Sequence, residues 1–395
     1  MLFFRKISSY LVQPGSTIGV GIFRILFGLV LQAEILQFLY FYDFIYGTAP
    51  GANWEIDNSI QLVFVGWWFI LVLLTIGVWV RPAAILNYIL SVVFFGSLRN
   101  FEYHVDYYFL GMNFLLMFLP KRTAFSLSWR PFGLKRPDDP VHGVTWGYVL
   151  LTGMIGIVFV YGDSVLTKIE SPMWRAGLGF YTPASLPMVS WSNLDWILDR
   201  EWLVKLMGWS VFIFEAALVL LLPIRSLRGP LAVFGFCFHV GICIAFPIPW
   251  FGLGVAAYYL LLLPDSWWQT IFKYLGLGGW LPEGLVDQDR ALRRLPWGIA
   301  FFIIALTTQV ILSLMHPVVQ RCLPERFNLA MDTVRSYVHP WSRQLLGMTR
   351  HGVFMDGHFA GYNHEIAVVR LKNGKEKWLP LIEKDGRPGS YLLGR

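Results

Sequence analysis

The chain has 395 residues, of which 56% are hydrophobic and only 14% are charged, whereas soluble domains carry roughly 25% charged residues. This composition excludes a string of ordinary soluble domains and indicates a polytopic membrane protein. The net charge of +7 comes from basic residues that cluster in loops between apolar segments, so nucleic acid is not expected as a partner.

Nine apolar segments are candidates for membrane-spanning helices, each of which needs about 20 mainly apolar residues. They cover residues 17–40, 59–80, 82–98, 103–119, 145–166, 203–223, 229–246, 250–264 and 296–315. The first segment contains Arg24 and Glu34 and is followed by no small-residue cleavage site, so we interpret it as a retained span and not a signal peptide. The sequence therefore predicts an all-α membrane domain over residues 1–315.

The loops of one side hold most of the lysines and arginines, which mark the cytoplasmic side of a membrane protein. The opposite loops hold only Arg99, Lys168, Arg175, Arg200 and Lys205. This asymmetry predicts a cytoplasmic N-terminus. Nine spans then put residues 316–395 outside, which means the periplasm if the protein lies in a bacterial inner membrane.

Two external segments differ from simple loops. Residues 167–202 are too many for a turn and are rich in tryptophan and tyrosine, so we expect them to lie along the interface and cover part of the bundle. In the charged tail, the alternating stretches 364–371 and 376–381 flank an Asn373-Gly374 dipeptide, which is a strong hairpin signal. We therefore predict a small β-rich external domain over residues 316–395.

Polar side chains inside spans need a partner or a function, because a charge at the membrane centre costs ~2.5–3.5 kcal/mol. For Arg24 we expect an ion pair within the bundle, with Glu34 or Glu215 as its partner. We interpret Arg24 and Glu215 as a structural polar network that also includes His239. The alternative for His239, which is alone on an apolar helix, is a direct role at a site.

Lys168 ends the fifth span on the outer side, six residues before Trp174. It either anchors the helix at the membrane surface or acts as a general base, since a lysine withdrawn from water can release its proton near neutral pH and an arginine cannot. His104 lies at the outer start of the fourth span, at a similar expected depth. Two titratable groups at one depth predict a single pocket near the external side.

Signals for other chemistry are weak. The sequence contains no complete dinucleotide fingerprint, no P-loop and no G-x-S-x-G motif. The three cysteines form no C-x-x-C pair, and the histidine spacing matches no standard metal site. Neither a metal nor a disulfide framework is expected.

Short motifs in several spans together resemble one known family. They are Phe23-Arg24-Ile25-Leu26-Phe27-Gly28, His104, the segment from Tyr161 to Ile169, Trp174, Glu215 and Phe238-His239. Their order and the membrane plan resemble the HTTM (horizontally transferred transmembrane) domain, the membrane domain of vitamin K-dependent γ-glutamyl carboxylase and of many bacterial relatives. The resemblance covers about residues 15–315, and the hairpin at 372–375 resembles a stretch of the carboxylase's lumenal region.

The resemblance implies an enzyme in which Lys168 acts as base on reduced vitamin K or a menaquinol-like isoprenoid quinol. Oxidation of the quinol by O2 to the epoxide then drives removal of a γ-proton from glutamate, and CO2 adds to the carbanion. The resemblance also implies that His104 is catalytic and that His239, Trp174 and Tyr161 bind the cofactor. The residues after His104 differ from the carboxylase pattern, which leaves its detailed role open.

The tail departs most from the carboxylase, because about 80 residues cannot reproduce its large substrate-recognising lumenal region. The substrate, a peptide or protein at the external face, therefore stays open. The alternative function is a non-enzymatic membrane factor for peptide maturation or export, as in other bacterial relatives. A transporter is a third hypothesis, but the sequence shows no internal repeat of the kind that transporters carry.

Overall fold

The computed structural model describes residues 2–42, 59–97, 104–127, 140–186, 189–281 and 284–350, together with 352, 356, 368–370, 373–378 and 389. Six helices in these ranges are long and apolar enough to cross a membrane. They are α2 (Ile18–Tyr40), α4 (Ser59–Ile76), the continuous helix α7–η3–α8 (Trp146–Glu170), α12 (Glu201–Leu221), α13 (Arg225–Ala245) and α16 (Gln288–Leu314). The chain is thus a helical membrane protein, as its composition predicts.

Three shorter elements complete the bundle. They are α5 with the π-helix η1 (Val80–Ser91 and Val92–Ser97), α6 (His104–Leu116) and α14 (Pro249–Leu262). Each of the nine predicted segments therefore contains a helix, because a continuous apolar run in a membrane has to satisfy its backbone hydrogen bonds internally. The three shorter helices lack the length of the other six.

Short elements connect the long helices at both ends of the bundle. The helices are α1 (Leu2–Leu11), α9 (Pro172–Arg175), α10 (Tyr181–Ser185), α11 (Asp195–Leu198), α15 (Asp265–Tyr274) and η4 (Gly278–Trp280). The strands are β1 (Pro14–Ser16), β2 (Val141–His142), β3 (Val144–Thr145) and β4 (Gly284–Leu285). They form two two-stranded sheets, β1 with β3 antiparallel and β2 with β4 parallel.

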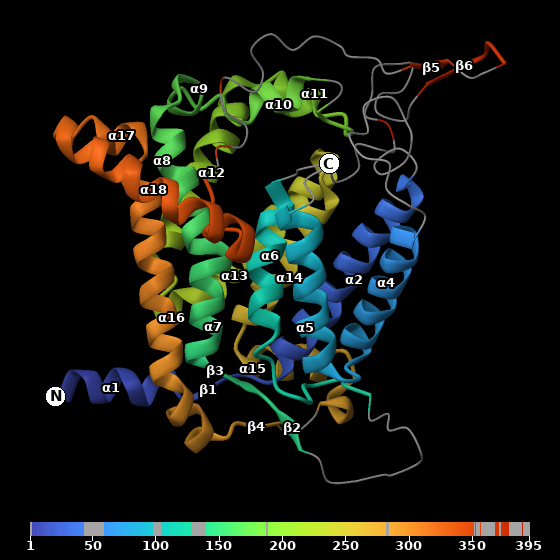
Figure 1. Cartoon of the computed structure of the whole chain (residues 1–395), viewed down its shortest axis with the longest axis vertical. Coiled ribbons are helices and arrows are strands. Elements are labelled where there is room, and N and C mark those ends of the chain that lie inside the picture. Colours follow the sequence, from blue (N-terminus) through green and yellow to red (C-terminus); the bar gives the residue numbers. More distant parts are fainter. Residues whose placement is uncertain are drawn as a thin grey trace.

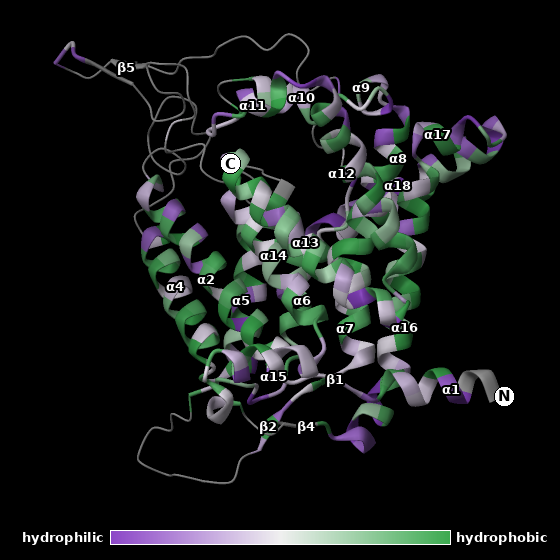
Figure 2. Ribbon diagram, turned by 180° about the vertical axis from the view of Figure 1, so that it is seen from behind, coloured by the Kyte–Doolittle hydropathy of each residue, from purple (hydrophilic) through white to green (hydrophobic). Residues whose placement is uncertain are grey.

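Figure 1 shows that α1 and β1–β4 lie at one end of the bundle and α9, α10 and α11 cross the other end. We call these the α1 end and the α9 end. The middle of the bundle is apolar and hydrophilic residues gather towards both ends, which is the pattern of a chain that crosses a bilayer (Figure 2). The expectation that residues 167–202 cover one end of the bundle agrees with the position of α9–α11.

Close helix contacts depend on small residues and on buried polar bridges. Gly28 of α2 lies against Thr75 of α4, where a Cβ would collide with the threonine hydroxyl, and Gln32 Nε2 donates to the same hydroxyl at 2.6 Å. Trp67 Nε1 of α4 donates to Asn87 Oδ1 of α5 at 2.8 Å. In a lipid environment such small-residue contacts and interhelical hydrogen bonds hold spans together, because burying apolar side chains gives little advantage.

The first part of the tail differs from the predicted β-rich domain, because it is helical. It forms α17 (Pro317–Gln320) and α18 (Glu325–Leu346), and α18 packs against α6, η1 and α16. Gly347, with φ +64°, ends α18 in an αL cap in which Gly347 N donates to Arg343 O at 3.1 Å. The charge of this segment predicts an external domain, but its apolar residues follow helical spacing and contact the bundle.

The hairpin predicted in the tail is present. Strands β5 (Val368–Arg370) and β6 (Glu376–Trp378) pair antiparallel, with Arg370 opposite Glu376. Gly374 has φ +79°, and Lys375 N donates to Asn373 Oδ1 at 3.0 Å. Because Arg370 pairs with Glu376, Asn373 and Gly374 lie in a five-residue connection and not in a two-residue turn, and the glycine supplies the positive φ. In the described part of residues 351–395, β structure is limited to this hairpin.

Candidate functional site

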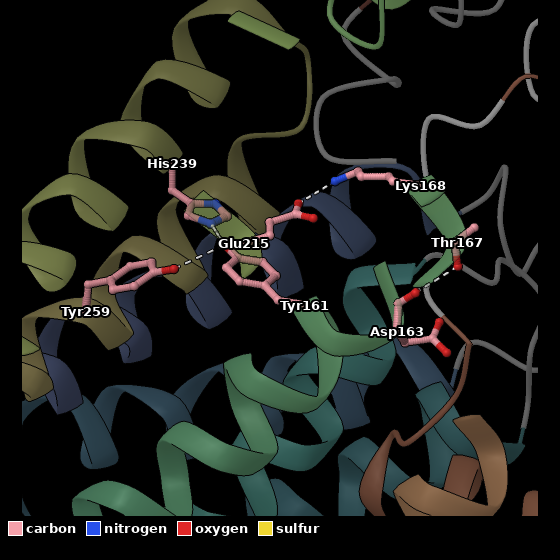
Figure 3. A network of polar contacts seen from close by, with 7 residues as sticks. All are labelled: Tyr161, Asp163, Thr167, Lys168, Glu215, His239 and Tyr259. Atoms are coloured by element: carbon pink, nitrogen blue, oxygen red, sulfur yellow. Dashed lines mark hydrogen bonds and ion pairs between the residues drawn. The ribbon is translucent and has the colours of Figure 1, made fainter. Parts of the chain in front are cut away.

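The end of α8 (Phe159–Glu170) carries a buried lysine that pairs with a glutamate of a neighbouring span. Nζ of Lys168, in the last turn of α8, forms an ion pair with Oε1 of Glu215 in α12 (Figure 3). The two side chains are only 6% and 7% exposed. Two opposite charges at this depth compensate each other, whereas either alone would be strongly disfavoured. Lys168 therefore does not extend its ammonium into water, as a lysine that anchors a helix end would.

Trp174 covers the ion pair. The chain turns after Glu170, and Ser171 caps α9 by accepting a hydrogen bond from Trp174 N at 3.2 Å. This turn brings the indole ring over Lys168, with Nζ 4.4 Å from the ring centroid, which is a cation–π distance. Gly179 lies directly behind the ring, where a Cβ would overlap it.

Two glycines allow the loop after α9 to approach α12 closely. Gly208 of α12 lies against the backbone of Gly177, so that a Cβ on Gly208 would overlap the Gly177 carbonyl. Gly177 has φ +77°, a conformation that side-chain-bearing residues rarely adopt. This contact holds the Trp174 loop beside the helix that supplies Glu215.

A π-helical segment precedes the site. η3 (Met154–Val158) joins α7 (Trp146–Gly153) to α8 within one continuous helix. A π-turn alters the direction of the residues that follow it, and such turns occur often at functional sites. The face that Tyr161 and Lys168 present to the bundle therefore depends on a local irregularity that apolar periodicity does not reveal.

A second polar group lies deeper in the same region. The hydroxyl of Tyr161 in α8 forms a hydrogen bond with Nε2 of His239 in α13, and the hydroxyl of Tyr259 in α14 donates to that of Tyr161 at 3.1 Å. The rings of Tyr161 and His239 are stacked, with centroids 6.2 Å apart. Figure 3 shows the Glu215 carboxylate beside Tyr161, so this group and the ion pair form one site.

Two buried atoms of the site have no hydrogen-bond partner among the described residues. They are Oε2 of Glu215, which can accept a proton or a hydrogen bond, and Nδ1 of His239. The aromatic side chains of Trp174, Tyr161 and Tyr259 lie around them. Unpaired buried polar atoms cost about 1–3 kcal/mol each, so a bound water or ligand group that satisfied either atom would stabilise the site.

Arg24 does not belong to this site, and the predicted network of Arg24, Glu215 and His239 is wrong for the described residues. Arg24 donates to the carbonyl oxygens of Leu74 at 2.7 Å and Ala124 at 3.2 Å, to that of Thr75, and to Thr123 Oγ1 at 2.9 Å. These acceptors lie near the α1 end, while Lys168 lies near the α9 end. A guanidinium has five donors, and here three carbonyl oxygens and one hydroxyl accept from it in place of the carboxylate of Glu34 or Glu215.

His104, the second predicted catalytic residue, begins α6, but its side chain lies outside the part of the chain that the structure describes. Its shared pocket with Lys168 stays a prediction. A crevice is present between α6, η3, α16 and the end of α18, lined among others by Tyr108, Gly156 and Met348. Lys168 does not line this crevice.

A histidine that the sequence reasoning did not single out lies one turn of α8 from the site. His316, between α16 and α17, is 2% exposed, and its Nε2 is 3.0 Å from Thr167 Oγ1. Its Nδ1 is 4.0 Å from Oε2 of Glu170, whose other oxygen pairs with Arg321 at 3.0 Å. These contacts fasten the start of the tail to the end of α8.

The structure thus brings together Lys168, Glu215, Trp174, Tyr161 and His239 out of the predicted residues, and it adds Tyr259. Tyr259 follows Tyr258 in an otherwise apolar helix, and the sequence gives no signal that separates it from a packing residue. No family model, curated protein or solved structure matches the chain. The function is therefore inferred from the site.

Proposed function

We propose that the chain is an integral-membrane enzyme of the HTTM family that oxidises an isoprenoid quinol to drive proton abstraction and carboxylation of a substrate. The observation that carries the proposal is the buried ion pair of Lys168 and Glu215 beneath Trp174. Ionisable side chains at membrane depth are costly and mark proton-handling or binding sites more often than structural ones. This pair joins two spans at a place where the chain also collects three hydrogen-bonded rings.

The proposal includes a membrane arrangement. Six long and three shorter helices together make nine spans, with the N-terminus in the cytoplasm and residues 316–395 in the periplasm of a bacterial inner membrane. The basic loops at the α1 end support this orientation. The site near the α9 end then faces the external leaflet, where a peptide substrate and the hairpin-containing external domain would meet it.

The chemistry of the site fits a quinol. A quinol head group is an aromatic ring with hydroxyls, and the site offers aromatic neighbours together with two unpaired polar atoms, Glu215 Oε2 and His239 Nδ1. Lys168, His239, Trp174 and Tyr161 are the residues that would hold it. When bound, a quinol supplies, through oxidation by O2, the driving force to ionise a weak carbon acid, to which CO2 then adds.

The protein's own part is to move one proton at the ion pair. In the proposal Lys168 Nζ passes a proton to Glu215 and, as a neutral amine, takes up the proton of a ligand hydroxyl. Trp174 excludes water from the pair, so that the proton does not escape to solvent. Glu215 also fixes the position of Nζ, which a flexible lysine stem would not do alone.

Purified protein in lipid nanodiscs tests the proposal directly. It is supplied with reduced vitamin K or a short-chain menaquinol, O2, radiolabelled bicarbonate and a glutamate-containing peptide. We expect quinone epoxide in the lipid extract and quinol-dependent label in the peptide. A folded protein that neither binds nor oxidises either quinol would contradict the proposal and leave the peptide maturation or export factor as the better hypothesis.

A further inference from the structure

Three rings from three different helices form a directed chain of hydrogen bonds. Tyr259 of α14 donates its hydroxyl proton to the oxygen of Tyr161 at 3.1 Å, and the Tyr161 hydroxyl meets Nε2 of His239 (Figure 3). Gly235 of α13 lies so close to the Tyr259 ring that a Cβ would overlap it, which fixes this ring against the helix that bears His239. The chain is therefore held by packing as well as by hydrogen bonds.

With Tyr259 as the donor to Tyr161, the second hydrogen bond is satisfied best when Tyr161 donates, because the opposite direction would leave the Tyr161 proton without an acceptor. A hydroxyl has one proton to donate, and the Tyr161 oxygen already accepts the proton of Tyr259. Tyr161 is then free to give its own proton to His239, so that Nε2 of His239 is the acceptor. A neutral imidazole carries one proton, and with Nε2 as acceptor that proton is on Nδ1.

His239 is neutral in this setting. Its side chain is 1% exposed, and its hydrogen-bond partner is a tyrosine and not a carboxylate. An imidazolium at such depth without a paired acid would carry a large desolvation cost. The Nδ1–H group is consequently a buried donor, and it has no acceptor among the described residues.

We propose that Tyr259, acting through Tyr161, is a positioning residue that holds His239 in the Nδ1–H tautomer, so that His239 donates a hydrogen bond to an oxygen atom of the ligand. The chemical class follows from the unpaired donor, because a bound hydroxyl, carbonyl or phenolate oxygen would satisfy it. The assignment of this oxygen to a quinol rests on the proposed function. The assignment of the tautomer rests only on the hydrogen bonds of Tyr259, Tyr161 and His239.

Nuclear magnetic resonance of ¹⁵N-labelled histidine in nanodiscs reads the tautomer without any activity measurement, because protonated and unprotonated ring nitrogens have distinct shifts. Of the eight histidines, only His104 and His239 are followed by valine. Pairwise labelling of histidine and valine therefore selects these two. A His104→Gln background isolates His239, and a His239→Gln sample assigns the signal by its loss if that variant folds poorly.

We expect the wild-type chain to show the Nδ1–H form. Tyr259→Phe should add a second, Nε2–H form, because no hydroxyl then donates to the Tyr161 oxygen and this oxygen can accept a hydrogen bond from His239 Nε2–H. Tyr258→Phe is the matched control, since the neighbouring Tyr258 hydroxyl donates to a backbone oxygen, Val149 O, at 3.2 Å. It should leave the His239 signals unchanged. A wild-type Nε2–H form, or a signal that Tyr259→Phe does not alter, would overturn the proposal.

Added ligand separates this inference from the function on which it partly rests. A short-chain menaquinol should move the His239 Nδ1–H signal, whereas 2-methylnaphthalene, which has the same rings without oxygens, should not. Equal shifts with both compounds would refute hydrogen-bond donation by Nδ1. An Nδ1–H form that neither compound moves would argue against a quinol ligand, and thus against the proposed function, while the role of Tyr259 in setting the tautomer would stand.

Discussion

Lys168 and Glu215 lie on different spans, and their side chains, 6% and 7% exposed, form an ion pair beneath the ring of Trp174. A buried ion pair adds little net stability, because the cost of removing both charges from water offsets their attraction. Its position in the fold is therefore better explained by a function than by stability. The contribution of the pair to stability and its contribution to activity can be separated by experiment.

Both charges of the ion pair should be required for activity, whereas the protein should fold without the pair. Glu215→Gln leaves the Lys168 ammonium without a counter-charge, so we expect a loss of roughly 3–5 kcal/mol of stability. The double replacement of Lys168→Met with Glu215→Leu removes both charges and should recover most of that loss while remaining inactive. Thermal unfolding in one detergent measures the stability of both variants, and quinol oxidation in nanodiscs measures their activity. A double variant as unstable as the single one would indicate that the pair has a structural role.

The position of Trp174 should depend on Gly179. Gly179→Ala introduces a Cβ that would overlap the indole ring, so the ring has to leave Lys168 and quinol oxidation should fall by about tenfold or more. Gly162→Ala, in α8, is the matched control, because no atom lies within 4 Å of its added Cβ. It should keep full activity and gain about 0.5–1 kcal/mol of stability. Equal activity of the two variants would exclude a role for the Trp174 position.

Stability should decrease on mild acidification because of His316. Burial lowers the pKa of His316 from its ordinary value of 6.5, and Arg350 lowers it further against the opposing effects of Asp163 and Glu170. The unfolded chain then binds more protons than the folded chain, so stability is lost as the pH falls below about 6.5. His316→Gln should flatten the decline of the melting temperature between about pH 7.5 and about pH 5.5. An equally steep decline in His316→Gln would contradict this assignment.

Nine spans require that the two ends of the chain lie on opposite sides of the membrane. Reporter fusions after Arg136 and after Arg395 should therefore report the cytoplasm and the periplasm respectively, as the loop charges predict. A fusion after Arg5 serves as a control for the cytoplasmic side. If the fusions after Arg136 and Arg395 report the same side, one span between them, such as the short helix α14, is not a complete span. If the fusions after Arg5 and Arg136 report opposite sides, α5 or α6 is the one that does not cross.

The sequence predicts the helices well because membrane spans need continuous apolar runs. It predicts the pairing of side chains poorly. Helix α14 is apolar on all sides, so nothing in its sequence indicates which face carries Tyr259. The π-helix η3 changes the direction of Tyr161 and Lys168 in a way that periodicity does not show. A count of charges predicts a carboxylate partner for Arg24, whereas backbone carbonyls and the Thr123 hydroxyl accept its hydrogen bonds.

The tail shows the same limit in a different form. Asn373 and Gly374 favour a local turn, so the hairpin is predictable from the sequence, although its five-residue connection is not. Helix α18 depends on long-range packing against α6 and α16. Its many charged residues make its apolar helical spacing hard to recognise in the sequence. Local chemistry was thus predictable, and tertiary contacts were not.

The central claim is that Lys168 takes up a proton from a quinol hydroxyl, and Lys168→Arg is the sharpest single test. Arginine keeps the positive charge, much of the stem and the contact with Trp174, but it cannot release its proton. Quinol binding and epoxide formation are measured on the same nanodisc sample, with the exposed Lys205→Arg as control. We predict unchanged binding and a fall in epoxide formation of about two orders of magnitude or more. Unchanged epoxide formation in folded Lys168→Arg protein would contradict the mechanism.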